Sequence, residues 1–161
     1  MNGQPIGVFD SGVGGISTLG SLRKELPGER FLYFGDTANA PYGTKPREQV
    51  LLLAEHVFNH LLESGAKAVV IACNTATAVA AAELRARYTL PIIGMEPALK
   101  PAAEARKSGQ ILVLATPVTL RLEKFARLMA LYGEGAVPVP CPGLMDLVER
   151  EDFSGAERYL R

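Results

Sequence analysis

The segment V-V-I-A-C-N-T-A-T-A, residues 69–78, places a thiol where a strand pattern gives way to a helical one. The amides at a helix N-terminus stabilise a thiolate, so this position predicts a lowered pKa for Cys73. Asn74 and Thr75 follow directly, and their short side chains can hydrogen-bond a ligand at the same place. The simpler alternative is a buried, inert cysteine, which is the usual fate of a thiol in a protein core.

Two familiar nucleophile motifs are missing from the sequence. A loop of the phosphotyrosine-phosphatase type requires an arginine at the position that Val79 occupies. A serine hydrolase of the G-x-S-x-G type requires a pentapeptide that the sequence does not contain. The sequence therefore predicts neither a phosphotyrosine-phosphatase loop nor a serine hydrolase of this type.

A second polar segment, V-F-D-S-G-V-G-G at residues 8–15, runs from a strand pattern into a glycine-rich turn and then a helical pattern. A dinucleotide site would use its near match to G-x-G-x-x-G, with Asp36 about twenty residues further on. A phosphatase of the aspartyl-phosphate type would need a second acid shortly after Asp10, where the chain has Gly12. Both interpretations fit this segment only in part.

The third interpretation of this segment is a site for a carboxylate or an amino acid. Glycine amides and a helix N-terminus can hold an anion, while Asp10 contacts an ammonium group or tunes the pKa of a catalytic base. A structural alternative also remains, in which Asp10 only caps the following helix. The segment taken alone leaves both of these roles open.

His56 and His60 lie one helical turn apart, which is a spacing that can hold a metal ion. The residues between them do not form H-E-x-x-H, and neither histidine lies on the apolar stripe of the same helical segment. We expect both on the surface without a chemical role, and we assign no metal and no cofactor.

The composition narrows the range of partners. The 161 residues include 17 Lys and Arg and 17 Asp and Glu, so no net charge attracts nucleic acid or a membrane surface. No signal peptide and no apolar run long enough for a membrane helix is visible, so we expect a cytoplasmic protein. Cys73 and Cys141 lie far apart without a C-x-x-C pair, and each is expected to be a free thiol.

Short apolar runs alternate along the chain with longer segments of helical periodicity, and these elements must position the polar segments. This alternation predicts an α/β fold: a mostly parallel sheet, buried on both faces and with helices on both sides. The expected strands are residues 6–9, 31–34, 68–72, 92–94, 111–115 and 137–139. The expected helices are residues 16–26, 47–64, 75–88, 98–107 and 118–132.

In such a sheet, a ligand binds beyond the carboxyl ends of the strands. Polar or reactive residues follow four of the expected strands, so we expect a site there. We expect a domain boundary near Glu96-Pro97, where a second strand-helix series begins. This boundary divides the chain into residues 1–96 and 97–161. The strand-end residues are Asp10-Ser11, Gly35-Asp36-Thr37, Cys73-Asn74-Thr75 and Glu96.

Three blocks stand out together: F-D-S-G-V-G-G at residues 9–15, Y-F-G-D-T-A-N-A-P-Y-G-T-K at 33–45 and A-C-N-T-A-T-A at 72–78. Weaker blocks are G-M-E-P-A at 94–98 and C-P-G-L-M-D-L-V-E at 141–149. This set of motifs resembles the glutamate racemase family, within the aspartate/glutamate racemase superfamily. The resemblance extends along the whole chain.

The resemblance implies a cofactor-independent interconversion of L- and D-glutamate through cysteine thiols, supplying D-glutamate for peptidoglycan. It also implies flavodoxin-like racemase lobes and a homodimer. Cys73 matches the family's first catalytic cysteine, and Asp10 and Glu149 match acids that assist the thiols. The substrate-binding residues that the resemblance implies are Asp10, Ser11, Tyr42, Gly43, Asn74 and Thr75.

The family's second catalytic cysteine lies in a G-C-T-H block, which this sequence does not contain, and Cys141 belongs to the separate C-P-G-L block. The helical pattern at residues 156–161 also ends without a cap. These observations predict a shortened chain with an incomplete second lobe that racemises glutamate poorly, because one base is missing. The sequence leaves two functions open. The first is a glutamate racemase, and the second is an inactive remnant or glutamate-binding module. A dinucleotide-binding oxidoreductase is a distant third.

Overall fold

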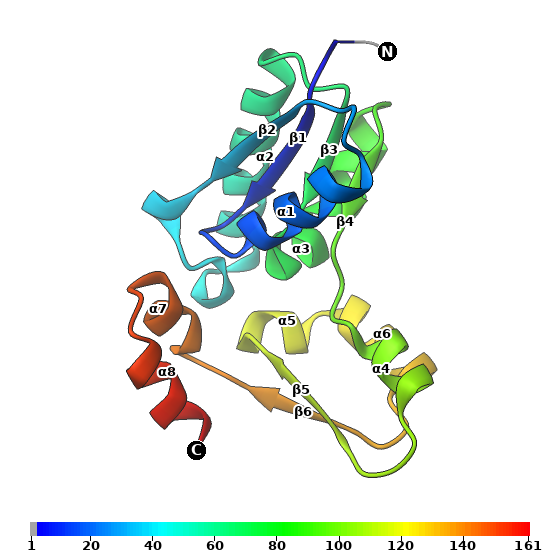
Figure 1. The fold of residues 1–161 in the computed structure, drawn as a ribbon, viewed down its shortest axis with the longest axis vertical. Helices are drawn as coiled ribbons and strands as arrows, with labels where there is room; N and C mark the ends of the chain where they lie inside the picture. The colour runs from blue at the N-terminus through cyan, green and yellow to red at the C-terminus, as the bar shows by residue number, and fades with distance from the viewer. Residues whose placement is uncertain (1–2) are drawn as a thin grey trace. The chain divides into compact units, whose positions relative to one another are not determined.

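A computed structural model describes residues 3–161 of the chain. The chain forms two compact units, of which the first ends at Met95 and the second covers Glu96–Arg161. Each unit contains its own parallel β-sheet, as Figure 1 shows. None of the helices in this described part has the length and apolar character needed to cross a bilayer.

The first unit is built on a four-stranded sheet with the order β2-β1-β3-β4, in which all neighbours are parallel. This order is typical of doubly wound α/β folds, and it places β1 and β3 at the centre. The prediction of a parallel α/β fold is confirmed. The strands are β1 (Ile6–Asp10), β2 (Phe31–Gly35), β3 (Ala68–Ile71) and β4 (Ile92–Gly94).

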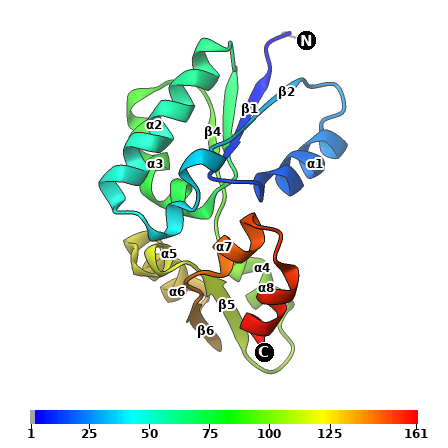
Figure 2. The same ribbon diagram turned by 90° about the vertical axis from the view of Figure 1, so that its left-hand side faces the viewer.

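Three α-helices cover this sheet: α1 (Gly15–Glu25), α2 (Arg47–Glu63) and α3 (Asn74–Arg87). Figure 2 shows α1 on one face of the sheet and α2 with α3 on the other. The apolar stripe of α2 is at most 1% exposed, because steps of three and four residues place its members on one side of the helix. These members are Val50, Ala54, Val57 and Leu61.

Between β2 and α2 the chain forms two short 3-10 helices, which the sequence pattern did not predict. They are η1 (Thr37–Asn39) and η2 (Tyr42–Thr44), and the Ala40-Pro41 peptide bond between them is cis. The η2 turn contacts α3. On its way from β2 to α2, this connection therefore packs against the helix that follows β3.

The second unit contains a two-stranded parallel sheet of β5 (Ile111–Ala115) and β6 (Ala136–Pro140). Its helices α4 (Leu99–Ala105) and α6 (Glu123–Tyr132) contribute to a core around Leu99, Val113 and Phe125. The neighbours of Val113 on β5 are exposed: Leu112 by 60% and Leu114 by 46%. The expectation that the strands are buried on both faces is therefore wrong for β5, and also for β4, where Ile93 is 49% exposed.

The single helix expected over residues 118–132 is instead two helices. α5 (Pro117–Arg121) is capped by the Thr116 side chain, and α6 follows after Leu122, whose backbone is extended (φ −78°, ψ 141°). No proline or glycine marks this break in the sequence. α7 (Leu144–Glu149), which was not predicted, contacts the last helix, α8 (Phe153–Leu160).

Candidate functional site

Cys73 lies at the junction of β3 and α3, where it is the N-cap residue of the helix. Its Sγ accepts a hydrogen bond from the Ala76 amide at 3.4 Å and lies 3.4 Å from Oγ of Ser11. Because β1 and β3 pair in parallel, with Phe9 opposite Ile71, the two strands end side by side. This register brings Ser11, which follows β1, to the thiol that follows β3.

Asp10 is the last residue of β1 and is 7% exposed. Its Oδ2 accepts hydrogen bonds from the amides of Gly12 at 3.3 Å and Gly15 at 3.1 Å. A side chain at position 15 would place its Cβ 2.7 Å from Cβ of Asp10, so this close approach requires glycine. Asp10 therefore holds the turn before α1 in place, although the N-cap residue of that helix is Gly14. Asp10 also raises the pKa of the Cys73 thiol, so capping is not its sole effect.

The pKa of the Cys73 thiol is raised above its ordinary value. Burial disfavours the thiolate most strongly, and the negative charge of Asp10 disfavours it further. The hydrogen bonds from Ser11 and from the Ala76 amide act in the opposite direction but do not outweigh these two effects. The lowered pKa expected from the helix N-terminus is therefore wrong.

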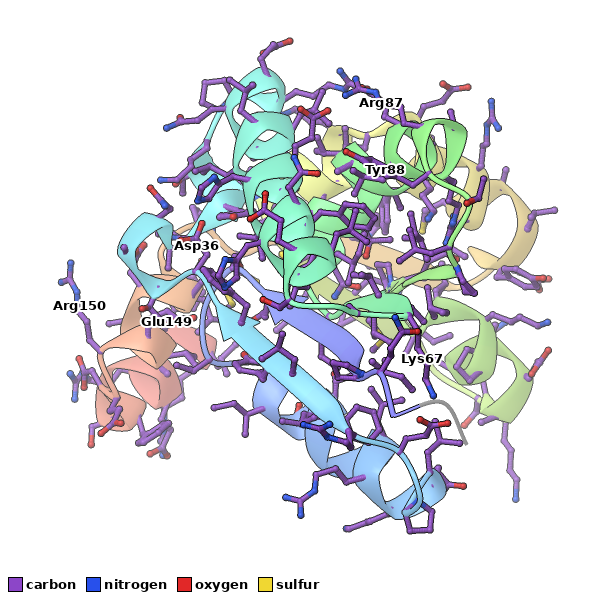
Figure 3. All side chains as sticks on the ribbon, turned by 90° about the horizontal axis from the view of Figure 1, so that it is seen from above. Asp36, Lys67, Arg87, Tyr88, Glu149 and Arg150 are labelled. Carbon is purple, nitrogen blue, oxygen red and sulfur yellow. The ribbon has the colours of Figure 1, made fainter. Side chains whose placement is uncertain are left out.

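Asp36, directly after β2, is 8% exposed and lies at the same end of the sheet. Figure 3 labels it beside the end of the β2 ribbon. The Tyr42 hydroxyl donates to Asp36 Oδ2 at 2.6 Å, and Nδ2 of Asn39 donates to Oδ1 at 2.9 Å. Burial, followed by the hydrogen bond and charge of Asp36, raises the pKa of Tyr42, so this phenol stays neutral at physiological pH.

Two more of the expected site residues, Asn74 and Thr75, are the first residues of α3. Asn74 is exposed, whereas Thr75 is 4% exposed. Sequence reasoning missed Thr77, whose Oγ1 donates to the carbonyl of Ile71 at 3.1 Å and accepts from the Met95 amide at 3.0 Å. The signal was available, because a threonine on the buried side of a helix satisfies its hydroxyl through the backbone.

The first unit thus brings together seven of the expected site residues at one end of its sheet. Glu149 lies elsewhere in the chain: it is the last residue of α7 in the second unit, where it is half-buried. Cys141 also belongs to the second unit and is, like Cys73, a buried free thiol. The seven residues are Asp10, Ser11, Tyr42, Gly43, Cys73, Asn74 and Thr75.

The two histidines of α2 are both exposed. The His60 ring meets the Phe34 ring edge-on, with the ring centroids 5.3 Å apart. Within residues 3–161, no group of three or more His, Cys, Asp and Glu side chains is arranged to hold a metal ion.

The family model for Asp/Glu/Hydantoin racemase matches residues 18–158. The chain belongs to the Asp/Glu/hydantoin racemase family. Among racemases of this family, it is similar to the glutamate racemase of Clostridium botulinum (strain Kyoto / Type A2), with 55% identity over 157 residues that cover 96% of this chain and 61% of the relative. It is also 56% identical to the glutamate racemase of Bifidobacterium adolescentis, over 98% of this chain and 62% of the relative.

Among solved racemase structures, the chain is similar to Escherichia coli glutamate racemase in complex with L-glutamate and the activator UDP-MurNAc-ala. The TM-score is 0.88 at 28% identity, and the match covers 98% of this chain and 63% of that one. The chain thus spans about three fifths of the length of the curated racemases that it matches.

Proposed function

We propose that this chain acts on glutamate as part of a cofactor-independent racemase, with Cys73 transferring the proton on one face of the α-carbon. The observation that carries this proposal is the buried Cys73 thiol, 3.4 Å from the Ser11 hydroxyl and close to the Asp10 carboxylate, at the ends of the central strands. Similarity to glutamate racemases supports glutamate as the substrate.

The polar groups around the thiol complement the two charges of an α-amino acid. The N-terminus of α3, with the side chains of Asn74 and Thr75, can donate hydrogen bonds to the α-carboxylate, because a helix N-terminus favours an anion. Asp10 and Ser11 can accept hydrogen bonds from the ammonium group. A substrate held between these groups has its α-hydrogen oriented toward Sγ of Cys73.

Substrate charge also provides a way to generate the base. Without substrate, burial and Asp10 keep Cys73 protonated, and an ammonium group beside Asp10 would offset that negative charge and lower the pKa of the thiol. The Cys73 thiolate then takes the α-hydrogen as a proton, and the electron pair of the C–H bond stays on the α-carbon beside the carboxylate. A second acid on the opposite face completes the inversion, and we propose that Glu149 assists such a group.

We further propose that the reaction supplies D-glutamate for peptidoglycan in the cytoplasm and that the protein acts as a homodimer. These points rest on the resemblance to the glutamate racemase family. Sedimentation of the purified protein tests the homodimer: a mass close to twice that of one chain supports it, and a monomer at all concentrations contradicts it.

The test of the substrate is exchange of the α-hydrogen in heavy water, followed by proton NMR with no cofactor added. We expect the α-hydrogen signal of glutamate to disappear in the presence of the chain, whereas those of aspartate and alanine persist. Exchange of aspartate in preference to glutamate, or exchange of none of the three by a folded chain, contradicts the proposal.

A further inference from the structure

Asp36 is a buried acid that has no part in the proposed proton transfer. Its carboxylate accepts hydrogen bonds from the side chains of Asn39 and Tyr42, and its amide donates to the Asp10 carbonyl at 3.0 Å. The backbone amide of Asn39 also donates to the Asp36 carbonyl at 3.0 Å. Asp36 therefore ties the segment of residues 37–44 to the end of β2 and to the end of β1.

We infer that Asp36 is a positioning residue, which fixes the main chain at Tyr42 and Gly43 beside Cys73 and so shapes the glutamate site. This inference rests on the proposed function, because it gives residues 42–43 a role in binding the substrate. Asp36 acts in it through Tyr42 and Asn39 and does not touch the substrate.

The Tyr42 side chain is buried and hydrogen-bonded within the protein. It is 1% exposed, and its hydroxyl donates to Asp36 at 2.6 Å. A ligand near this residue would therefore meet its main chain and that of the neighbouring Gly43, so the position of the backbone decides how well the ligand is held. The hydroxyl-carboxylate hydrogen bond anchors this backbone through the phenol ring.

The anchored turn lies next to the catalytic thiol. The η2 turn contacts α3, the helix that begins directly after Cys73. The Tyr42 hydroxyl donates to Asp36, and the Asp36 amide donates to the Asp10 carbonyl at 3.0 Å, so the anchor is tied to the strand end that Ser11 and Cys73 share. A shift of the Tyr42 anchor is therefore transmitted to the place where we expect glutamate to bind.

The same geometry argues against two other roles for Asp36. A ribose-binding acid in a dinucleotide site, or a general base, must present an oxygen to its ligand. Asp36 is 8% exposed, and both of its carboxylate oxygens already accept hydrogen bonds from side chains of the following turn. The positioning role accounts for these contacts without a further partner.

The experiment measures how glutamate protects Cys73 from alkylation by iodoacetamide, with the label located by mass spectrometry. In Tyr42→Phe and in Asp36→Asn, we expect the half-protecting glutamate concentration to rise about tenfold, as for loss of one hydrogen bond to a charged group. The double variant should show less than the product of the two single effects, because both remove the same contact.

The first control tests whether a variant loosens the whole fold, and it uses a measurement that such loosening would change. Asp36 is not among the groups that shift the pKa of Cys73, so the pH profile of Cys73 alkylation without glutamate should be unchanged in Asp36→Asn. Tyr88→Phe is the matched substitution, since it removes a hydroxyl that donates to Asn59 Oδ1 at 2.8 Å near the C-terminal end of α3 (Figure 3). Its half-protecting concentration should equal that of the wild type.

Amide hydrogen exchange gives a second readout that does not depend on glutamate. We expect residues 37–44 to exchange at least about tenfold faster in Tyr42→Phe, with β1 and β3 unchanged. If glutamate protects the wild type but the variants keep its half-protecting concentration, the inference is overturned. If glutamate does not protect the wild type, the proposed function fails, and unchanged exchange at residues 37–44 would then also overturn the anchoring by Asp36.

Discussion

The central strands of the first unit and the strands of the second unit are covered to different extents. In the first unit, adjacent residues of β3 are both buried, with Val69 0% and Val70 5% exposed. In the second unit, Val113 of β5 is 8% exposed, whereas its neighbour Leu112 is 60% exposed. Both strands are uninterrupted apolar runs in the sequence. Such a run therefore predicts a strand, but the helices packed around it decide how many of its faces are buried.

The two cysteines show a similar difference. Both thiols are buried and free. Cys73 lies beside the Ser11 hydroxyl and within the electrostatic reach of Asp10, whereas the Cys141 thiol donates to the carbonyl of Val139 at 3.5 Å. Burial is therefore shared by the two thiols, and the Ser11 hydroxyl and the Asp10 carboxylate mark the one in the first unit as a candidate for proton transfer.

The largest expected effect separates these two thiols. Cys73→Ala should reduce the rate of glutamate α-hydrogen exchange by about 10² to 10⁴-fold, the usual effect of losing a positioned acid or base. Cys141→Ala should change that rate by less than about threefold, because a packing change alone does not remove a proton-transfer group. NMR in heavy water measures both rates. Equal losses in the two variants would remove the distinction between the thiols.

The second prediction concerns the strands themselves. Val69→Ala and Val70→Ala should each lower the free energy of unfolding of the first unit by about 2 kcal/mol, because each deletes buried methyl groups on one face of β3. Leu112→Ala should change the free energy of unfolding of the second unit by less than about 0.5 kcal/mol. Urea denaturation followed by hydrogen exchange on each unit provides the values. A large loss in Leu112→Ala would contradict the one-sided burial of β5.

A smaller effect is expected from the charge beside Cys73. Asp10→Asn keeps an oxygen that can accept from the Gly15 amide but removes the charge that helps to raise the pKa of the thiol. The pKa of Cys73 should fall, and its alkylation rate at pH 8 should rise about two- to fivefold, because only the thiolate reacts. Asp36→Asn is the matched control: it neutralises another buried strand-end acid, and the pH midpoint of Cys73 alkylation should stay unchanged in it. A midpoint lowered equally in both variants would assign the effect to loosened packing.

The smallest expected effect is on stability at alkaline pH. The folded first unit raises the pKa of Cys73, so above the pKa of the unfolded thiol the unfolded chain binds fewer protons than the folded one. Its free energy of unfolding should therefore fall by about 1 kcal/mol or less between pH 7 and pH 9. Cys73→Ser, which does not titrate in this range, should flatten the decline. An equal decline in wild type and variant would contradict the raised pKa.

Much of the fold was predictable because it depends on local patterns. The alternation of apolar runs and helical segments located every strand of the structure to within one residue at each end. It also indicated that Asp10 and Cys73 lie at the carboxyl ends of strands in a parallel sheet. The break at Leu122 could not be predicted, because no proline or glycine marks it and its extended backbone is visible only in the structure.

The strand-end positions of Asp10 and Cys73 were predictable from the sequence, whereas the electrostatics around them were not. The helix N-terminus beside Cys73 could be inferred from the sequence, but the burial of the thiol and the closeness of Asp10 depend on how β1, β3 and their helices pack. The hydrogen bond between Asp36 and Tyr42 could not be predicted either, because the two residues are joined through 3-10 turns that have no periodic sequence pattern. Quantities that depend on tertiary distances required the structure.

In the proposed function, glutamate binds at the strand ends of the first unit, against Cys73. Peptide-mapped alkylation of the wild-type chain at about pH 9, with and without glutamate, tests it most directly, since both buried thiols are followed in one sample. We expect glutamate to slow the labelling of Cys73 at least about tenfold and to change that of Cys141 by less than about twofold. Equal slowing of both thiols, or slowing of Cys141 alone, would contradict a glutamate site at Cys73.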